Sequence, residues 1–235
     1  MRRLMLPLLF LFSLLVLVVA PFVGIVNIPF SALFGNAADG LSRVLWELRI
    51  PRVMLGWITG STLAICGLIF QALFRNPLAS PDMLGVSTGA AFGAVLYIRL
   101  GLAFSLLGIS GLSMAAFCGA LLATLAIYFA GTLKRGGISE GTLLLAGIAM
   151  SFLFGSVNMI IQYSGGYTDT FRMMRWSMGG IQTVGFSSVC ATFPALVVIF
   201  ILVLFTSHEL NLFGRGEEIE ASRGVSVSGV RKILF

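Results

Sequence analysis

Charged residues are scarce in this chain of 235 residues, because Asp, Glu, Lys and Arg together make up only 10% of it. An ordinary soluble domain carries roughly 25%. Hydrophobic residues reach 58%, and a soluble globule of this length could not cover them with polar surface. The composition therefore excludes a cytosolic enzyme, a secreted disulfide scaffold and a disordered chain. It predicts an integral membrane protein.

Residues that bind metals or perform covalent chemistry are also few. Cys66, Cys118 and Cys190 all lie in apolar runs without the spacing of metal ligands, and His208 has no Cys or His close in sequence. A phosphate-binding G-x-x-x-x-G-K-[ST] loop is missing as well. We therefore expect no catalytic residue, no metal and no cofactor. The 15 basic residues are scattered through loops, which favours membrane topology over nucleic-acid binding.

Six apolar runs approach the roughly 20 residues that a helix needs to cross the bilayer. They are Leu4–Val26, Val53–Phe74, Leu84–Leu102, Gly111–Leu133, Thr142–Tyr163 and Ser188–Phe205. Pro21 follows Ala20, which favours a retained first helix over a cleaved signal peptide. An N-terminus inside leaves more Lys and Arg on the cytoplasmic side. We predict an all-α polytopic helix bundle forming one membrane domain over residues 1–235.

The spans hold small and amide side chains but no Asp or Glu. A transporter driven by protons or sodium ions usually has carboxylates or unwound cation sites within its spans. In the fifth run, Gly147, Ser151 and Gly155 follow one another at helical spacing, and Asn158 and Gln162 continue the row. Polar side chains are costly in lipid, so this face is expected to point inward. It lines either a helix contact or an aqueous path. Any transport would draw its energy from another protein.

Three segments between the spans stand out. Arg49-Ile50-Pro51-Arg52 precedes the second run on the predicted outer side, as a turn that its proline stiffens. Its arginines are either interfacial anchors or a basic socket for an acidic partner. After a polar loop at 164–170, the segment Phe171–Gly180 is expected to form a half-helix that re-enters the bundle. The glycine pair Gly179-Gly180 is expected to break this helix. The cytoplasmic stretch at 207–232 contains a short helix from Glu217, and is either a connector or a knob for a soluble partner.

The pattern as a whole resembles the FecCD/BtuC-type permeases of ABC importers, which carry iron chelates, haem and cobalamin. The matching segments, in chain order, are Arg49–Arg52, Gln71–Ala79 with Pro81, Leu84–Ser87 with Gly89-Ala90, Leu143–Gly147, Trp176–Gly180 and Gly216–Val227. The Asn-Pro-Leu-Ala stretch at 76–79 is the most specific of them. The resemblance implies a transport subunit that is not itself an enzyme, working by alternating access.

The resemblance also implies partners. They are a second permease copy or a paralogous permease, a cytoplasmic ABC ATPase dimer, a periplasmic or lipoprotein substrate-binding protein, and the lipid of a bacterial or archaeal cytoplasmic membrane.

The resemblance further implies residue roles, which fall into four sets. Arg49 and Arg52 dock the binding protein, and Glu217, Glu218, Ala221, Arg223 and Gly224 couple to the ATPase. Ser139, Glu140, Gly141 and Thr142 form a cytoplasmic gate, and the translocation path is lined by Gly147, Ser151, Gly155, Asn158, Gln162, Trp176 and Met178. The substrate is expected to be a ferric siderophore or haem. Cobalamin is the alternative, as is a truncated subunit that does not transport.

This sequence departs from the family pattern at two positions and in length. Glu220 and Arg223 stand where a small residue and Leu are common. The resemblance implies a fold of about ten spans, whereas this chain stops at Phe235, inside the expected start of a seventh span from Val230 onward. We therefore expect the chain to be a C-terminally truncated form, or to be completed by a second polypeptide.

Overall fold

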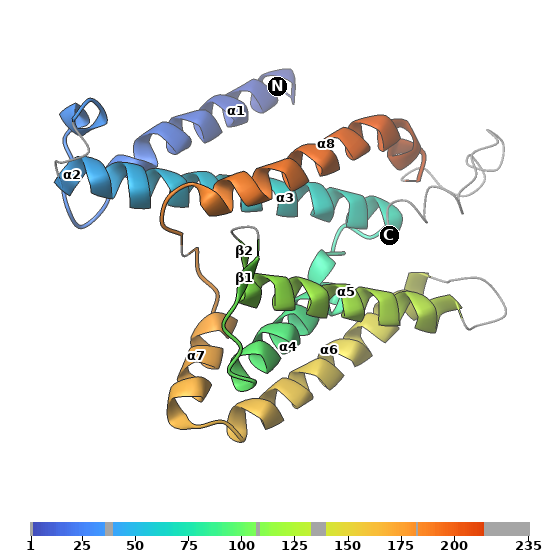
Figure 1. The fold of residues 1–235 in the computed structure, drawn as a ribbon. Coiled ribbons are helices and arrows are strands. Elements are labelled where there is room, and N and C mark those ends of the chain that lie inside the picture. The colour runs from blue at the N-terminus through green and yellow to red at the C-terminus, as the bar shows by residue number, and fades with distance from the viewer. Residues whose placement is uncertain (1, 36–39, 107–108, 133–139, 182, 214–235) are drawn as a thin grey trace. The chain divides into compact units, whose positions relative to one another are not determined.

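The computed structural model describes residues 2–35, 40–106, 109–132, 140–181 and 183–213. They fall into two compact units. Unit 1 comprises Met1–Thr62 and Ile181–Ile199, and unit 2 comprises Leu63–Gly180 and Phe200–Phe235. The helices α3 (Ile50–Leu73) and α8 (Ser187–Phe213) each contribute residues to both units. Figure 1 shows the chain with its elements labelled.

Unit 1 begins with α1 (Arg2–Val19), which gives way to a 3₁₀ turn, η1 (Ala20–Phe22). The predicted first span runs on to Val26, which is wrong by several residues. Pro21 lies in the first turn of η1, where its missing N–H and fixed φ suit a new, tighter turn rather than continued α-helix. A second 3₁₀ turn, η2 (Phe30–Leu33), follows.

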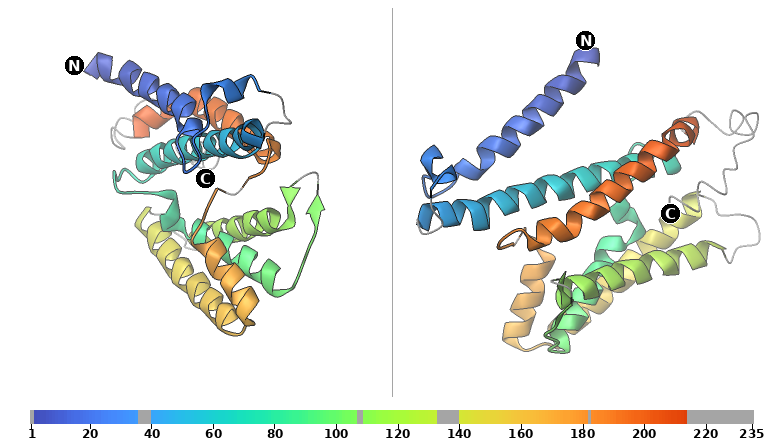
Figure 2. Two further views of the ribbon diagram at one scale, coloured as in Figure 1. Left: turned by 90° about the vertical axis from the view of Figure 1, so that its left-hand side faces the viewer. Right: turned by 45° about the horizontal axis from the view of Figure 1, so that its top comes forward.

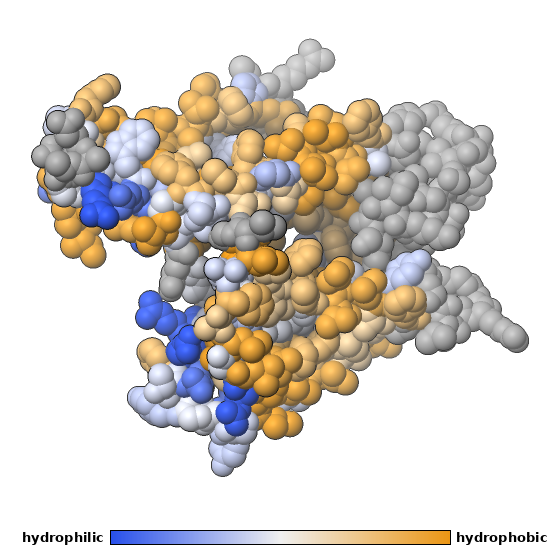
Figure 3. Space-filling view, in the orientation of Figure 1, coloured by the Kyte–Doolittle hydropathy of each residue, from blue (hydrophilic) through white to orange (hydrophobic). Residues whose placement is uncertain are grey.

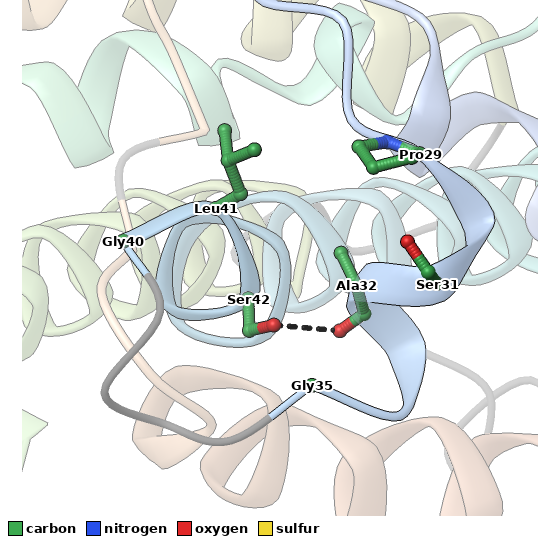
Figure 4. Close-up of a pocket in the computed structure, with 7 residues that line it drawn as sticks. All are labelled: Pro29, Ser31, Ala32, Gly35, Gly40, Leu41 and Ser42. Atoms are coloured by element: carbon green, nitrogen blue, oxygen red, sulfur yellow. Dashed lines mark hydrogen bonds between the residues drawn. The ribbon is translucent and has the colours of Figure 1, made fainter.

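A continuous helical run then extends from Gly40 to Leu73. It consists of α2 (Gly40–Arg43), the π-helical turn η3 (Val44–Arg49) and α3. A small core of Ile28, Ala32 and Leu45 joins it to the preceding loop. The buried Ser42 hydroxyl donates to the Ala32 carbonyl oxygen at 2.9 Å, beside a pocket of about 390 Å³ lined mainly by small residues (Figure 4).

Unit 2 contains a four-helix assembly of α4 (Val86–Arg99), α5 (Gly111–Thr132), α6 (Glu140–Tyr163) and α7 (Tyr167–Ser177). The views of Figures 1 and 2 agree that α4 lies against α5 and α6. A 3₁₀ turn, η4 (Pro81–Leu84), leads into α4. The strands β1 (Ser105–Leu106) and β2 (Ile109–Ser110) form a short antiparallel hairpin before α5.

Small residues, among them Gly89 and Gly93 of α4 and Gly119 of α5, let these two helices approach closely. A Cβ atom added at Gly93 would lie 2.8 Å from the Ala115 carbonyl carbon, which belongs to the α5 backbone. Among the described residues of unit 2, two buried clusters pack the helices further. One joins Leu84, Ile127 and Leu143, and the other joins Val95, Ile98 and Met173. In a membrane, such close contacts replace the hydrophobic force that packs soluble helices.

Among the described residues, five helical segments are long and apolar enough to cross a membrane. They are Met5–Phe22, Gly40–Leu73, Gly111–Phe129, Gly141–Tyr163 and Ser187–Ser207. The third expected span, Leu84–Leu102, is wrong in length, because α4 has 14 residues and a rise of about 21 Å. Gly85 takes a left-handed conformation with φ 67° and ends η4, so the helix begins only at Val86.

The surface agrees with a membrane protein. Large apolar side chains are exposed along α1, α5, α6 and α8, and Figure 3 shows these helices mostly in orange. Hydrophilic residues of unit 2 gather at the end that carries α7. The fold class predicted from the sequence, an all-α polytopic membrane protein, is confirmed, with the two-residue strands of the hairpin as a minor addition.

Candidate functional site

The Arg-Ile-Pro-Arg segment is helical, and the expected turn at this place is wrong. Its first residue ends η3 and the other three open α3. Pro51 is buried and has no N–H to donate to the carbonyl group one turn earlier, that of Glu47. The Glu47 carbonyl oxygen instead accepts a hydrogen bond from the Gly185 N–H at 2.7 Å. The π-helical turn and the proline therefore create an acceptor that a distant loop satisfies.

Arg49 lies half-buried at the end of η3 and is used inside unit 1. Its Nη1 donates to the Pro21 carbonyl oxygen at 3.1 Å, and its Nη2 donates to that of Val26 at 2.6 Å. A Cβ atom at Gly24 would lie 2.9 Å from Nη2, so the guanidinium fills the space that this glycine leaves. Arg49 thus ties the irregular segment after α1 to the start of α3.

Arg52, three residues further on, is exposed and makes no hydrogen bond or ion pair with any residue that the structure describes. Arg43 differs again, because its Nε lies 3.0 Å from a Glu47 carboxylate oxygen. The three arginines near this helix start therefore have different surroundings. Of the two arginines that the resemblance singles out, only Arg52 presents an uncommitted guanidinium.

The polar face of α6 packs against the segment that enters α4. A Cβ atom at Gly147 would lie 2.9 Å from the Leu84 Cα atom and even closer to the Met83 carbonyl oxygen. Ser151 Oγ donates to the Gly147 carbonyl oxygen at 2.9 Å and would lie 3.1 Å from a Cβ at Gly85. In this part of the row, the structure shows the helix contact, one of the two alternatives that the sequence left open.

Asn158 makes a further contact with α4, about two helical turns beyond Ser151. Its side chain is only 6% exposed, and its Nδ2 donates to the Thr88 carbonyl oxygen on α4 at 3.2 Å. Its Oδ1 is buried and accepts no hydrogen bond from the described residues. An interhelical amide bond of this kind contributes about 0.6 kcal/mol on average in a membrane protein. Asn158 is therefore a link between α4 and α6, and its role in a translocation path stays a prediction.

The remaining predicted path residues are more open. A Cβ atom at Gly155 would meet no atom within 4 Å, and Gln162 is half-buried, its carbonyl oxygen accepting from Thr170 Oγ1 at 2.8 Å. Trp176 is half-buried near the end of α7, whereas Met178 is 85% exposed just beyond it. The structure does not gather these four residues into one enclosed site.

The predicted half-helix exists as α7 but begins four residues earlier than expected. Gly166 is its N-cap residue and Asp169 lies in its first turn, where a carboxylate is favoured by the helix dipole. The polar residues at 167–170 lower the local hydropathy, so the apolar pattern placed the start of this helix too late. The helix ends at Ser177, and Gly179 follows with φ 76°, so the predicted break at the glycine pair is confirmed.

Two predicted sets lie wholly or partly outside the described residues. The coupling residues Glu217, Glu218, Ala221, Arg223 and Gly224 fall outside, as does Ser139 of the predicted gate. Glu140 and Gly141 open α6, and Thr142 follows them within the helix. Within the described ranges, no group of three or more His, Cys, Asp or Glu side chains could hold a metal ion.

Two features were not predicted from the sequence pattern: the backbone hydrogen bond from Gly185 to Glu47, and the hydrogen bonds of Arg49 to the carbonyl groups of Pro21 and Val26. Pro51 was a usable signal for the first, because a proline inside a helix frees a carbonyl group that needs another donor. No sequence signal marks the second, since the acceptors of Arg49 lie 28 and 23 residues earlier in the chain.

The five described helices that are long and apolar enough to span a bilayer indicate a multi-pass membrane protein. A family model described as the FecCD transport family matches residues 6–235. The chain belongs to this family.

Named relatives and a solved structure agree. The chain is 36% identical over 192 residues to the cobalamin import system permease protein BtuC of Halobacterium salinarum, covering 82% of this chain and 50% of that protein. It is 32% identical over 228 residues to the hemin transport system permease protein HmuU of Yersinia pestis, covering 96% and 67%. A metal-chelate type ABC transporter solved in an inward-facing conformation matches with a TM-score of 0.77 and 25% identity, covering 96% of this chain and 68% of that one. The chain spans about half to two thirds of the length of these proteins.

Proposed function

We propose that this chain is a permease subunit of a binding-protein-dependent ABC importer, which moves a ferric siderophore or haem across the cytoplasmic membrane. The observation that carries this proposal is the family match, which extends over nearly the whole chain. The relative named for hemin transport, aligned over 96% of this chain, supports the substrate class. The chain supplies no ATP-binding motif, so a separate ATPase performs hydrolysis.

Cobalamin is the second candidate substrate. The relative that is 36% identical to this chain is named for cobalamin import, which favours this alternative directly. Uptake of radiolabelled iron chelates and of radiolabelled cobalamin, compared between parent cells and cells that lack this gene, separates the two. Loss of iron uptake supports the first candidate and loss of cobalamin uptake the second. If neither changes, the transport proposal is wrong for both substrates.

The proposed mechanism is alternating access. In it, two permease copies surround the path, and an ATPase dimer binds the cytoplasmic segment at 207–232. Closure of the ATPases rotates the spans as rigid bodies and opens the path toward one side. The N-terminus lies inside, so that the end of α1 and the start of α3 face outward. Gly155, Gln162, Trp176 and Met178 are the predicted path residues that the packing of unit 2 leaves most open.

Within this proposal the two arginines near the start of α3 have separate roles. Arg52 receives an acidic side chain of the binding protein, because its guanidinium is exposed and unpaired among the described residues. Arg49 holds the segment after α1 in place through the carbonyl groups of Pro21 and Val26. The docking surface thus consists of one contacting arginine and one positioning arginine.

Charge reversal at each position tests this division. Arg52→Glu is expected to weaken binding of the binding protein, most at low salt, without lowering the melting temperature of the transporter. Arg49→Glu is expected to lower the melting temperature too, because two carbonyl groups lose their donor and a carboxylate replaces it. If both variants behave alike in the two assays, the division of roles is wrong.

A further inference from the structure

The exposed face of α7 carries two parallel strips of side chains. Residues three and four positions apart lie on one side of a helix, one turn after another. Tyr167, Phe171 and Met174 form an apolar strip with this spacing, and all three are largely exposed. Beside it, Thr168, Arg172 and Arg175 form what we call the α7 basic strip, whose three members are also exposed. The opposite side of the helix holds Met173, which is fully buried against Val95 and Ile98 of α4.

The charge of the α7 basic strip is not neutralised within the structure. The single salt bridge among the described residues joins Arg43 to Glu47 in unit 1. Asp169 is the one acidic residue of α7; it is half-buried and lies beyond salt-bridge distance of both arginines. Neither Arg172 nor Arg175 donates a hydrogen bond to a described residue.

A further arginine increases the positive charge at this end of unit 2. Arg99 closes α4 and donates through Nη2 to the Ser164 carbonyl oxygen at the end of α6, at 3.3 Å. A carbonyl oxygen orients this guanidinium but leaves its net charge in place. The end where α4 and α6 finish and α7 begins therefore carries three arginines, with Asp169 as the one carboxylate among its described residues.

The surroundings of the strip indicate an aqueous setting. Ser164, Gly165 and Gly166 form the turn between α6 and α7, and Thr168 separates the two arginines from it. Figure 3 shows hydrophilic residues gathered at this end, in contrast to the apolar sides of the helices. A helix that lay among lipid tails would not present half of its exposed face as polar and charged side chains.

The shape of the strip favours a protein over a small molecule. Sites for small ligands are concave and bury most of the ligand surface. Arg172 and Arg175 instead stand on the exposed, convex side of a helix, one turn apart. Two guanidinium groups at that spacing suit two carboxylates of a facing protein surface, each accepting bidentate hydrogen bonds. The neighbouring exposed Tyr167 and Phe171 add apolar contact area of the kind found at protein interfaces.

We propose that the α7 basic strip is a docking surface for an acidic face of the extracytoplasmic substrate-binding protein. This inference rests on the proposed function, and it adds a contact in unit 2 to the one assigned to Arg52 in unit 1. The unpaired arginines attract the acidic partner over a distance and speed its association. The strip also adjoins Trp176 and Met178, so a partner held there stands next to two predicted path residues.

The test measures association of the purified cognate binding protein with the complete transporter, held in nanodiscs of uncharged phosphatidylcholine. The variant Arg172→Gln/Arg175→Gln is compared with Arg172→Lys/Arg175→Lys, which keeps both charges. The Gln pair is expected to associate at least about tenfold more slowly at about 50 mM salt, and the difference is expected to shrink at about 300 mM. The Lys pair is expected to retain most of the wild-type rate. Melting temperatures and basal ATP hydrolysis check that both variants fold.

Three outcomes would overturn the inference. One is an unchanged association rate for the Gln pair, and another is an equal loss in the Gln and Lys pairs, which would indicate a structural role. The third is an unchanged association rate together with loss of co-purifying anionic lipid in the Gln pair, which would assign the strip to lipid headgroups. If the wild-type transporter itself does not bind the binding protein, the proposed function fails instead, so the two failures are distinguishable.

Discussion

The contact between α6 and the segment before α4 predicts opposite effects for one substitution at two positions of the same helix. Gly147 and Gly155 both lie within α6, two turns apart. Replacing either by Ala removes the helix penalty of glycine, a gain of roughly 0.5–1 kcal/mol. At Gly155 the new Cβ meets no atom within 4 Å, so this gain is kept. At Gly147 the new Cβ would run into the backbone of Met83 and Leu84, which cannot rotate away as a side chain can.

The difference between the two variants isolates the packing cost, because the helix-propensity gain cancels. Overpacking costs typically about 1–3 kcal/mol. For a chain of this size, each kcal/mol shifts the melting temperature by about 2–4 °C. We therefore expect Gly147→Ala to melt at least about 2 °C below Gly155→Ala. Fluorescence-detected size-exclusion chromatography of the heated complete transporter measures this difference. Equal melting temperatures would refute the close contact between Gly147 and Met83.

Three further predictions concern the same subunit. Gly155→Trp is expected to leave the melting temperature unchanged while reducing substrate uptake to near background, and normal uptake would remove Gly155 from the path. Asn158→Asp is expected to destabilise the transporter by more than about 2 kcal/mol, because a carboxylate replaces the donor to the Thr88 carbonyl at a site that is 6% exposed. A melting temperature equal to wild type would contradict that link. Replacing Glu217 and Glu218 by Lys is expected to separate ATP hydrolysis from binding-protein docking, and stimulation equal to wild type would exclude both from the coupling surface.

The long helices could be predicted from the sequence because each coincides with an apolar run. The expected span Gly111–Leu133 matches α5 to within one residue, and Thr142–Tyr163 matches α6 to within two. The expected Ser188–Phe205 stops eight residues short of the end of α8. The helix continues into polar residues there, and hydropathy reports where a chain is apolar rather than where its backbone hydrogen bonds stop.

The misjudged elements begin or end at special backbone positions. Leu84–Leu102 overstates α4 at both ends, because Gly85 before the helix and Gly101 after it are left-handed, and average hydropathy does not depend on the sign of φ. The expected turn at Pro51 assumed that proline ends a helix. Here the helix continues through Pro51 after the π-helical turn, because the Gly185 N–H donates to the Glu47 carbonyl group that the proline cannot reach with an N–H of its own. Such compensation depends on a residue more than a hundred positions away, so local sequence cannot show it.

In the candidate sites too, the sequence pattern predicts the orientation of a side chain but not the residue with which it interacts. Helical spacing correctly indicated that Asn158 points inward, but its partner is Thr88, 70 residues earlier on another helix. The sequence grouped Arg49 with Arg52 as equals. Only the fold separates them, by placing two carbonyl groups within reach of Arg49 and none within reach of Arg52 among the described residues. Residue type and spacing predict what a side chain can do, and the neighbouring elements decide whether it is free to do it.

Substrate uptake by the complete transporter in proteoliposomes shows whether this chain works as the permease of an ATP-driven, binding-protein-dependent importer. The assay loads ATP inside the vesicles, where the ATPase faces, and adds the cognate binding protein and a radiolabelled ferric chelate outside. We expect accumulation of the chelate to require both ATP and the binding protein and to be lost in Gly155→Trp. Accumulation without the binding protein, or accumulation driven by an ion gradient in the absence of ATP, would contradict it.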